Sequence, residues 1–395
     1  MRPRKKVKIT GIHADWKHPT QIRFGVDRVR EVADVCWSLG VCAPLLVTDQ
    51  GVARLPVVQQ IKTDNLEQSI ETSVFSEISG EPDADCVQKG AEIFLRNRHD
   101  SIIAVGGGSG LDAGKAIGLA SAVGPKQMWS FAADNVHPPV VVRQIPPIIA
   151  IPTTTGTGSE VDANAVITGT KSHRKISLFH KDLMPRVVLA DPKLTRRLNP
   201  YLTAATGMDA LAHNLEALCS PVFQPILDGI ALYALGLIKD WLPVAVSQGR
   251  NLEARTYTMA ASIMGAMAFE KGLGAVHAVA HAVGSVAKIH HGRAIGAILP
   301  FVLKANQRAV KEKMGQLARN IGLPKHDFQA VLNWILDLRH QLGLPATLGE
   351  LGIGKSQVPL LAETALQDVN MATNPVPMDA DKLERLLYKA VQGRL

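Results

Sequence analysis

The sequence lacks any apolar run long enough to cross a bilayer. A membrane-spanning helix needs roughly 18 to 20 apolar residues in succession, and the longest candidate, residues 230–238, is bounded by the charged Asp228 and Lys239. No apolar stretch with a small-residue cleavage site follows the basic start of the chain, residues 1–8, so no secretory signal is indicated. These absences predict a protein that neither spans a membrane nor is secreted.

Cysteine is scarce, and its spacing forms no recognisable pattern. Only four cysteines occur among 395 residues, and no two of them form a C-x-x-C pair. This argues against a disulfide framework and against a thiolate zinc site, and it favours reduced thiols in a cytoplasmic protein.

Positive charge is plentiful but not clustered. Forty-three Lys and Arg residues against 35 Asp and Glu residues give a formal net charge of +8, yet beyond residues 1–8 the basic positions are dispersed and without interleaved aromatic residues. Nucleic-acid binding, which would predict affinity that falls steeply with salt, is therefore the weaker hypothesis. The same positive field also suits a small anionic ligand.

Material for a buried interior is abundant. Hydrophobic residues make up 46% of the chain and charged residues 20%, which is typical of a folded globular protein. The length is about two to three times that of a usual domain, and no repeat or low-complexity linker interrupts it. We expect two domains, residues 1–192 and residues 193–395.

Short β-branched runs alternate with helical stretches in the first half of the chain. Buried strands are predicted at residues 44–49, 101–105, 147–151 and 187–191. Apolar residues recur at helical spacing in segments such as 26–39 and 83–96. This alternation predicts a Rossmann-like α/β domain with a parallel sheet. Strand signals stop after residue 191, so the second domain is predicted to be all-helical.

A glycine run, residues 106–110, follows one of these strands and precedes a helix. Bare N–H groups at a helix start attract phosphate. A Walker loop is excluded because Ser109 and Ala116 replace its glycine and its Ser or Thr. A Rossmann fingerprint is incomplete, because the candidate acid Asp49 lies upstream. A hydroxyl-rich loop at residues 152–160 follows the next strand, and together the two loops favour a nucleotide over ordinary turns.

Histidines and a carboxylate gather at helical spacing in the second half. Asp209 and His213 are four residues apart, as are His277 and His281, so each pair lies on one helix face. His291 follows at a predicted turn. Burying these groups among Ala and Val is costly unless a divalent cation binds them. The spacing predicts a metal site suited to Fe²⁺ or Zn²⁺, and it leaves open which of His281 and His291 is a ligand.

Four motifs in order resemble the iron-containing (group III) alcohol dehydrogenase family. They are Gly106-Gly107-Gly108-Ser109 with Asp112 and Lys115, the loop 152–161, Gly207-Met208-Asp209-Ala210-Leu211 with His213, and His277-x3-His281-x9-His291-Gly292. The resemblance extends from about residue 24 to residue 375. It implies a dehydroquinate synthase-like architecture: an N-terminal NAD(P)-binding α/β domain, a helical C-terminal domain, and a metal ion in the cleft between them.

The resemblance also implies roles for individual residues. The implied metal ligands are Asp209, His213, His277 and His291, and His281 becomes a catalytic histidine near the nicotinamide that relays a proton. The implied dinucleotide contacts are Gly107, Gly108, Ser109, Asp112, Thr153, Thr154, Thr157 and Lys175. Asp49 matches an acid that favours NAD over NADP by repelling a 2′-phosphate. The implied metal is divalent, with iron preferred and zinc as the alternative.

The implied activity is hydride transfer between nicotinamide and a small alcohol or aldehyde on the metal, in a homodimeric dehydrogenase or reductase. Related alternatives are a glycerol dehydrogenase, a maleylacetate reductase, or a lyase of the dehydroquinate synthase type, which the loop 156–160 disfavours. Three residues depart from the family pattern, Glu81, Asp162 and Val376. None belongs to the implied metal set, and they leave the choice of substrate open.

Overall fold

The protein is described here by a computed structural model that covers residues 13–18, 20–133, 135, 142, 144–169 and 175–395. The basic segment at residues 1–8 lies outside these described residues. The chain divides into two compact units. The first comprises Met1–Thr154 and Ser159–Arg196, and the second comprises Thr155–Gly158 and Arg197–Leu395.

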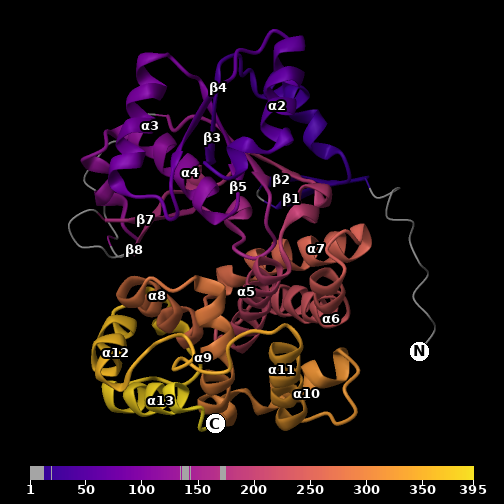
Figure 1. The fold of residues 1–395 in the computed structure, drawn as a ribbon, viewed down its shortest axis with the longest axis vertical. Helices are drawn as coiled ribbons and strands as arrows, with labels where there is room; N and C mark the ends of the chain where they lie inside the picture. Colours follow the sequence, from indigo (N-terminus) through magenta and orange to yellow (C-terminus); the bar gives the residue numbers. More distant parts are fainter. Residues whose placement is uncertain (1–12, 19, 134, 136–141, 143, 170–174) are drawn as a thin grey trace. The chain divides into compact units, whose positions relative to one another are not determined.

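A seven-stranded sheet forms the centre of the first unit (Figure 1). Its strands, in spatial order, are β1 (His13–His18), β2 (Thr20–Gly25), β9 (Val187–Ala190), β6 (Ile148–Pro152), β5 (Ser101–Gly106), β3 (Pro44–Asp49) and β4 (Ser73–Ile78). All neighbours are parallel except β1, which pairs antiparallel with β2 at one edge. The predicted parallel sheet is thus confirmed, while β1, β2, β4 and the hairpin of β7 (Asn164–Thr168) and β8 (Lys175–Phe179) were not anticipated.

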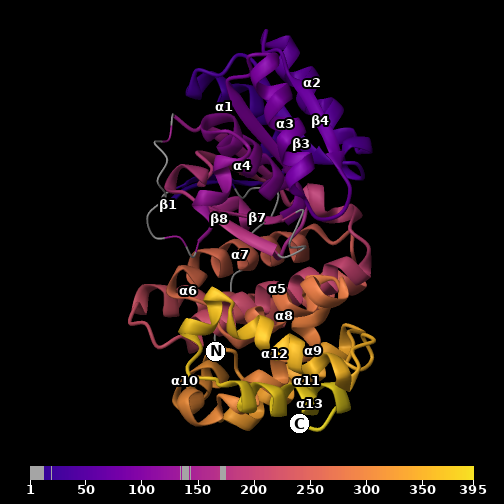
Figure 2. The same cartoon turned by 90° about the vertical axis from the view of Figure 1, so that its left-hand side faces the viewer.

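Helices cover both faces of this sheet. They are α1 (Val32–Leu39), α2 (Pro56–Glu67), α3 (Ala84–Arg96) and α4 (Gly108–Val123). Alternation along β5 sends Ile103 and Val105 into a core shared with α1 and α2. The opposite face meets α4, where a Cβ added to Gly114 would lie 2.7 Å from the Cβ of Ala104. Helix α3 packs beside α4 (Figure 2).

The second unit is helical. Its helices are α5 (Pro200–Cys219), α6 (Pro225–Ser247), α7 (Leu252–Ala268), α8 (Ala275–Ala287), α9 (His291–Ala305), α10 (Gln307–Asn320), α11 (Phe328–Gln341), α12 (Val358–Leu366) and α13 (Ala380–Gln392). Residues 197–395, all described, contain no strand, which confirms the all-helical prediction. The side chain of Asn199 accepts a hydrogen bond from the Leu202 N–H and Pro200 opens α5, as expected for a capped helix start.

The sequence-based expectation missed one feature: helix α6, although charged residues interrupt its apolar run, is long and apolar enough, by length and composition, to cross a membrane. It also carries Asp228, Lys239 and Asp240. Its buried side chains, among them Leu235 and Leu242, belong to the core of the second unit, where α6 packs against α5 and α7. With 39% of its most apolar window buried, α6 packs against this core by one face, as an amphipathic helix does.

Candidate functional site

Three helices of the second unit supply the predicted metal ligands. Helix α5 carries Asp209 and His213, which are only 3% and 5% exposed. Their four-residue spacing places both side chains on one face of this almost wholly buried helix. Helix α8 carries His277, which is 2% exposed, and α9 begins at His291. The predicted ligands therefore come from helices that share one core.

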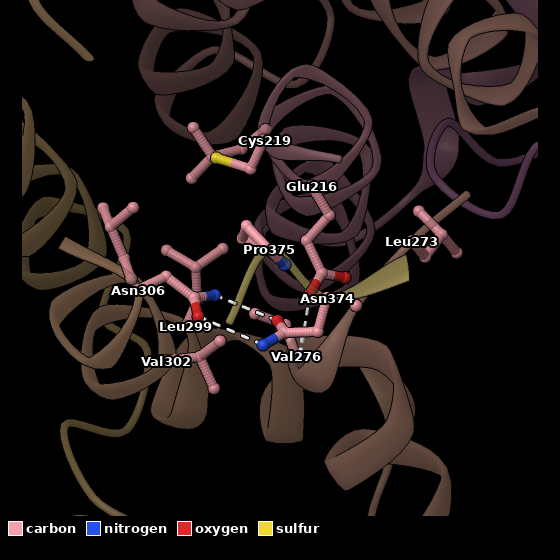
Figure 3. A pocket seen from close by; sticks show the side chains of 12 residues that line it. Glu216, Cys219, Leu273, Val276, Leu299, Val302, Asn306, Asn374 and Pro375 are labelled. Carbon is pink, nitrogen blue, oxygen red and sulfur yellow. Dashed lines mark hydrogen bonds between the residues drawn. The ribbon is translucent and has the colours of Figure 1, made fainter. Parts of the chain in front are cut away.

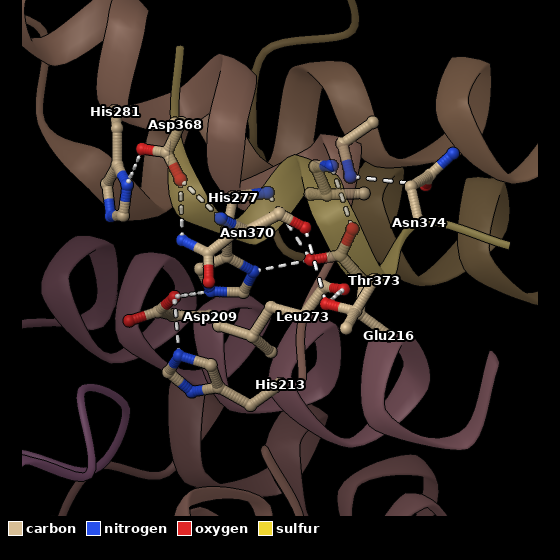
Figure 4. A network of polar contacts seen from close by, with 12 residues as sticks. Asp209, His213, Glu216, Leu273, His277, His281, Asp368, Asn370, Thr373 and Asn374 are labelled. Carbon is tan, nitrogen blue, oxygen red and sulfur yellow. Dashed lines mark hydrogen bonds and ion pairs between the residues drawn. The ribbon is translucent and has the colours of Figure 1, made fainter. Parts of the chain in front are cut away.

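The three imidazoles converge on a single oxygen. Asp209 Oδ1 lies 3.9 Å from the Nε2 of His213, 3.5 Å from that of His277 and 3.5 Å from that of His291. The first three of these residues offer ligand atoms within 4.8 Å of one another. The rings of His213 and His277 stack at 4.5 Å between centroids. Figure 4 shows the Asp209 carboxylate beside these two rings.

Two atoms at this point have unmet bonding capacity. Asp209 Oδ1 and His277 Nε2 are buried and have no hydrogen-bond partner, an arrangement that is costly for a protein interior. A divalent cation would satisfy both atoms at once. One carboxylate oxygen and three imidazole nitrogens suit Fe²⁺ or Zn²⁺. The residues present therefore fit the metal that the sequence predicts.

The Nδ1 atoms of two predicted ligands, His213 and His277, are hydrogen-bonded on the side away from Asp209. His213 Nδ1 donates to the carbonyl oxygen of Gly156 at 3.0 Å, and His277 Nδ1 donates to Glu216 Oε2 at 2.6 Å. A proton on Nδ1 leaves the lone pair on Nε2, which is the atom that faces Asp209. Hydrogen bonds of this kind fix the tautomer and the ring orientation of metal-binding histidines.

The charges around Asp209 shift the acidity of its neighbours. Burial alone would raise the pKa of Asp209, but the adjacent His213, His291 and His277 hold it well below its usual value. Burial outweighs the attraction of Asp209 and lowers the pKa of His213 to about 4. For His277 burial is outweighed by the nearby carboxylates of Asp209 and Glu216, the second of them hydrogen-bonded to the ring, and its pKa is raised to about 9. At neutral pH Asp209 is therefore ionised and His213 neutral, as metal ligands must be, while a cation that binds His277 would have to displace a proton from that ring.

His281 points to a different partner. Its Nδ1 donates to Asp368 Oδ2 at 2.8 Å, and its ring stacks on that of His291 with 5.1 Å between centroids. The side chain is 29% exposed. Its ring is therefore held beside the cluster of Asp209 and the three imidazoles, and its polar contact is a carboxylate from the loop after α12.

Two carboxylates that contact the histidines were missed by the sequence reasoning. Glu216 lies seven residues after Asp209 and three after His213 on α5, so helical periodicity could have placed it on the same face. Asp368 is separated from His281 by 87 residues. No local spacing connects these two positions, and only the fold brings them together.

The start of α9 depends on the glycine that follows His291. A Cβ added to Gly292 would overlap the backbone carbonyl oxygen of Ala205 on α5. We expect Gly292→Ala to push α9 away from α5 and to carry His291 with it. Unfolding should become easier by about 1–3 kcal/mol, as in other overpacked cores, and metal content should fall.

The control for this change is Gly229→Ala, because nothing lies within 4 Å of a Cβ added to Gly229 on α6. That variant should be slightly more stable, by roughly 0.5–1 kcal/mol, with unchanged metal content. Urea unfolding and elemental analysis provide both readouts. Equal behaviour of the two variants would show that the tight approach of Gly292 to α5 does not govern the site.

The predicted dinucleotide residues lie at the carboxyl ends of three neighbouring strands in the first unit. Thr153 N–H, after β6, donates to the Gly106 carbonyl at the end of β5 at 2.9 Å. A Cβ on Gly106 would lie 3.6 Å from Asp49 Oδ2, at the end of β3, and one on Gly107 would lie 3.0 Å from the Thr154 side chain. This edge is where open parallel sheets bind ligands.

Helix α4 starts at this edge. It begins at Gly108, followed by Ser109, and its N-cap Gly107 provides no side-chain cap, so the positive end of the helix dipole is left for a ligand. In its first turns Asp112 accepts a hydrogen bond from Ser159 Oγ at 2.5 Å. Burial raises the pKa of Asp112 to about 7.

The other two predicted dinucleotide residues have different surroundings. Lys175, at the start of β8, forms an ion pair with Glu81 at 2.5 Å. Glu81 is one of the residues that depart from the family pattern, and its carboxylate holds the ammonium group of Lys175. Thr157 belongs to the short segment Thr155–Gly158, which is part of the second unit.

Asp162, the second residue that departs from the family pattern, forms an ion pair with Lys115. Lys115 is 1% exposed and its Nζ lies 2.5 Å from Asp162 Oδ1. The same ammonium group donates to the carbonyl oxygens of Asp162 and Asn164. A buried lysine is costly unless it is paired and hydrogen-bonded. Asp162 supplies the negative charge that stabilises the buried ammonium group of Lys115. The pair ties α4 to the start of β7.

The buried acid beside this pair predicts a pH-dependent stability. Glu160 is 3% exposed, and burial raises its pKa from 4.5 to about 7. The folded state then holds the proton more tightly than the unfolded state, so stability is lost as pH rises from about 4.5 through 7. Between pH 5 and pH 8 the wild type should lose about 2–3 kcal/mol of unfolding free energy relative to Glu160→Gln.

Urea titrations at the two pH values measure this difference. The exposed Glu71 provides the control, because Glu71→Gln should follow the wild type at both pH values. A wild type that tracks Glu160→Gln between pH 5 and pH 8 would show that Glu160 titrates normally.

Comparisons with known proteins agree with this geometry. The family model described as "Iron-containing alcohol dehydrogenase" matches residues 19–192, and the one described as "Fe-containing alcohol dehydrogenase family, C-terminal" matches residues 203–391. A 1,3-propanediol dehydrogenase of Citrobacter freundii is 36% identical over 91% of this chain and 94% of its own length. A 4-hydroxybutyrate dehydrogenase of Cupriavidus necator is 34% identical over 94% of this chain and 98% of its own length.

Solved structures extend the likeness to three dimensions. A crystal structure of a 1,3-propanediol oxidoreductase superposes with a TM-score of 0.89 at 33% identity, covering 96% of this chain and 99% of the other. A sulfoacetaldehyde reductase of Bifidobacterium kashiwanohense, solved in complex with NAD⁺, superposes with a TM-score of 0.84 at 30% identity, with the same coverage.

Proposed function

The chain belongs to the iron-containing alcohol dehydrogenase family, and from this premise we propose which of its residues bind the metal, the cofactor and the substrate. The family relationship makes the chain an NAD-linked alcohol dehydrogenase, an oxidoreductase whose substrates are small alcohols and aldehydes. The observation that carries the proposal is the convergence of three Nε2 atoms on Asp209 Oδ1. That arrangement leaves a buried carboxylate oxygen to be satisfied by a cation.

We propose that Asp209, His213, His277 and His291 hold one divalent ion, with Fe²⁺ as the resident metal and Zn²⁺ as the alternative. Such an ion, when bound, supplies Lewis-acid chemistry that lowers the pKa of an alcohol hydroxyl and polarises a carbonyl. Gly156 and Glu216 hold two of the imidazole rings by their Nδ1 atoms. These hydrogen bonds thus orient the two Nε2 atoms toward the proposed metal position before an ion binds.

The proposed cofactor is NAD, held at the carboxyl edge of the sheet in the first unit. Gly107, Gly108 and Ser109 at the start of α4 would bind the diphosphate through backbone N–H groups, with Asp112, Thr153, Thr154, Thr157 and Lys175 as further contacts. Asp49 accepts hydrogen bonds from the N–H groups of Gly51 and Val52, which fixes its carboxylate. A fixed negative charge there would repel the 2′-phosphate of NADP.

His281 is the proposed proton relay. Its Nδ1 is bound to Asp368, so Nε2 is the nitrogen that can accept a proton from the alcohol side of the reaction and return it to solvent. The partial exposure of the side chain suits this exchange. Asp368 would orient the ring and stabilise the protonated imidazole, as carboxylates do behind other catalytic histidines.

The proposed substrates are short primary alcohols and diols and the matching aldehydes. The relatives named above include a 1,3-propanediol dehydrogenase and a 4-hydroxybutyrate dehydrogenase. We also propose a homodimer, and a cytoplasmic location that is supported by four free cysteines, Cys36, Cys42, Cys86 and Cys219.

A direct assay tests the proposed reaction. Metal-loaded protein is given NAD with a panel of short alcohols and diols, or NADH with the matching aldehydes, and nicotinamide absorbance is followed. We expect turnover with at least one pair in both directions. A complete lack of absorbance change across the panel, with the metal verified by elemental analysis, would contradict the proposed substrates.

A further inference from the structure

We propose that Glu216 is the positioning residue for the metal ligand His277, and that its carboxylate sets which ring nitrogen is available to the ion. The inference rests on the proposed metal-dependent function. It concerns a side chain outside the ligand set, whose charge and hydrogen bonds act on the ion through His277.

One carboxylate holds both the ring and the backbone of the same ligand. Glu216 Oε2 accepts from His277 Nδ1 at 2.6 Å and from His277 N–H at 3.3 Å. Its Oε1 accepts from the Val276 N–H at 2.8 Å. Figure 4 shows Glu216 beside the first turn of α8, on the side of the His277 ring away from Asp209. The ring is therefore fixed in position and in tautomer.

The surroundings of Glu216 make these hydrogen bonds necessary. The side chain is 7% exposed and borders a small cavity whose other lining is largely apolar, including Leu299 and Val302 (Figure 3). Within the described residues its ion-pair partner is His277. A buried carboxylate needs compensation, and here the N-terminal N–H groups of α8, with the positive end of the helix dipole, provide the remainder.

The charge of Glu216 also completes the proposed metal site. A divalent ion bound by the single carboxylate of Asp209 leaves one unit of positive charge in a buried place. Glu216, in contact with His277, brings the sum of the ion and the two carboxylates to zero. Carboxylates behind metal-binding histidines raise the basicity of the coordinating nitrogen in the same way.

The isosteric change Glu216→Gln separates this role from simple packing. An amide has only one acceptor oxygen, so its NH₂ must face either His277 Nδ1 or the Val276 N–H. In the first orientation the ring proton moves to Nε2, the nitrogen that must bind the ion; in the second the ring keeps its hydrogen bond but loses the negative charge behind it. The same reversal of tautomer inactivates enzymes in which asparagine replaces the aspartate behind a catalytic histidine.

Asn374 offers a matched control on the same helix end. Its Oδ1 accepts from the Ala275 N–H at 3.2 Å, so it also caps α8, and it borders the same cavity. It is bound to Asn306 and to Val376, and not to a metal ligand. Asn374→Ala therefore removes helix capping while the carboxylate behind His277 stays in place.

The experiment uses metal-free full-length wild type, Glu216→Gln and Asn374→Ala. Co²⁺ affinity is measured by chelator competition, and the visible spectrum of bound Co²⁺ is recorded. Urea unfolding of the metal-free proteins measures the stability that is lost when the cap of α8 is removed. We expect Glu216→Gln to bind Co²⁺ about 10–100-fold more weakly with an altered spectrum. Asn374→Ala should lose stability and keep the wild-type Co²⁺ affinity.

The possible outcomes are distinguishable. Wild-type Co²⁺ affinity in Glu216→Gln, or an equal loss in both variants, overturns the positioning role and leaves the metal site intact. A wild type that binds no Co²⁺ overturns the proposed metal-dependent function and this inference with it. If Glu216→Gln does not fold, Glu216→Asp decides: its shorter carboxylate keeps the charge but withdraws from His277 Nδ1, so Co²⁺ affinity should still fall, and wild-type affinity in that variant overturns the proposal.

Discussion

His277→Ala should purify with almost no bound metal and with no measurable turnover. The substitution removes one of the four proposed ligand atoms and takes away one of the three imidazoles around Asp209 Oδ1, while Glu216 loses its ring partner. Loss of a partner behind a ligand already costs 10–100-fold in affinity, so we expect a loss of at least about 100-fold here. Elemental analysis of protein purified without chelator, together with the alcohol assay, measures both effects.

Cofactor binding provides the internal control for this variant. The proposed NAD contacts belong to the first unit, apart from Thr157, so NAD affinity should remain close to that of the wild type. The exposed His326 offers a matched change, because His326→Ala should retain metal and activity. Full metal content in His277→Ala would contradict the proposed ligand set. Loss of NAD binding together with the metal would point to general misfolding.

Asp49→Asn should shift the cofactor preference toward NADP by about 100-fold in the ratio of kcat/KM values. Asparagine keeps an oxygen that can accept from Gly51 and Val52, so the turn is preserved and only the charge is removed. Relief of a like-charge contact of about 3 kcal/mol gives a change of this size. Initial rates with NADH and NADPH, at saturating aldehyde, measure the ratio.

An exposed acid distant from the strand ends serves as the control for Asp49. Glu67, the last residue of α2, is exposed, and Glu67→Gln should leave the cofactor ratio unchanged. If Asp49→Asn retains the wild-type ratio while its NADH kinetics are normal, Asp49 does not face the 2′ position. A loss of activity with both cofactors would instead assign Asp49 a structural role at the end of β3.

Much of the fold could be predicted because its signals are local. The segments 44–49 and 101–105 are short apolar runs bounded by turns, and they coincide with β3 and β5. Helix α5 begins at the Asn199-Pro200 cap that the sequence indicates. Edge strands were harder to predict: β4 buries only Phe75 and Ile78 and contains polar side chains, so it lacks the continuous apolar run of a central strand.

The candidate site was predictable where its residues share a helix. The four-residue spacing of Asp209 and His213 predicts that they share a helix face, and the same holds for His277 and His281. That spacing could not tell that His277 faces Asp209 while His281 faces Asp368. Partners such as Asp368 come from distant segments, and their contribution depends on tertiary packing that no local pattern encodes.

The most direct measurement is anomalous X-ray diffraction at the iron and zinc absorption edges, on crystals of protein purified without chelator. The account predicts one strong peak per chain, about 2.0–2.3 Å from an oxygen of Asp209 and from the Nε2 atoms of His213, His277 and His291. The same data identify the metal. A bound metal whose peak lies away from these four atoms, or four side chains too far apart to share one ion, would contradict it.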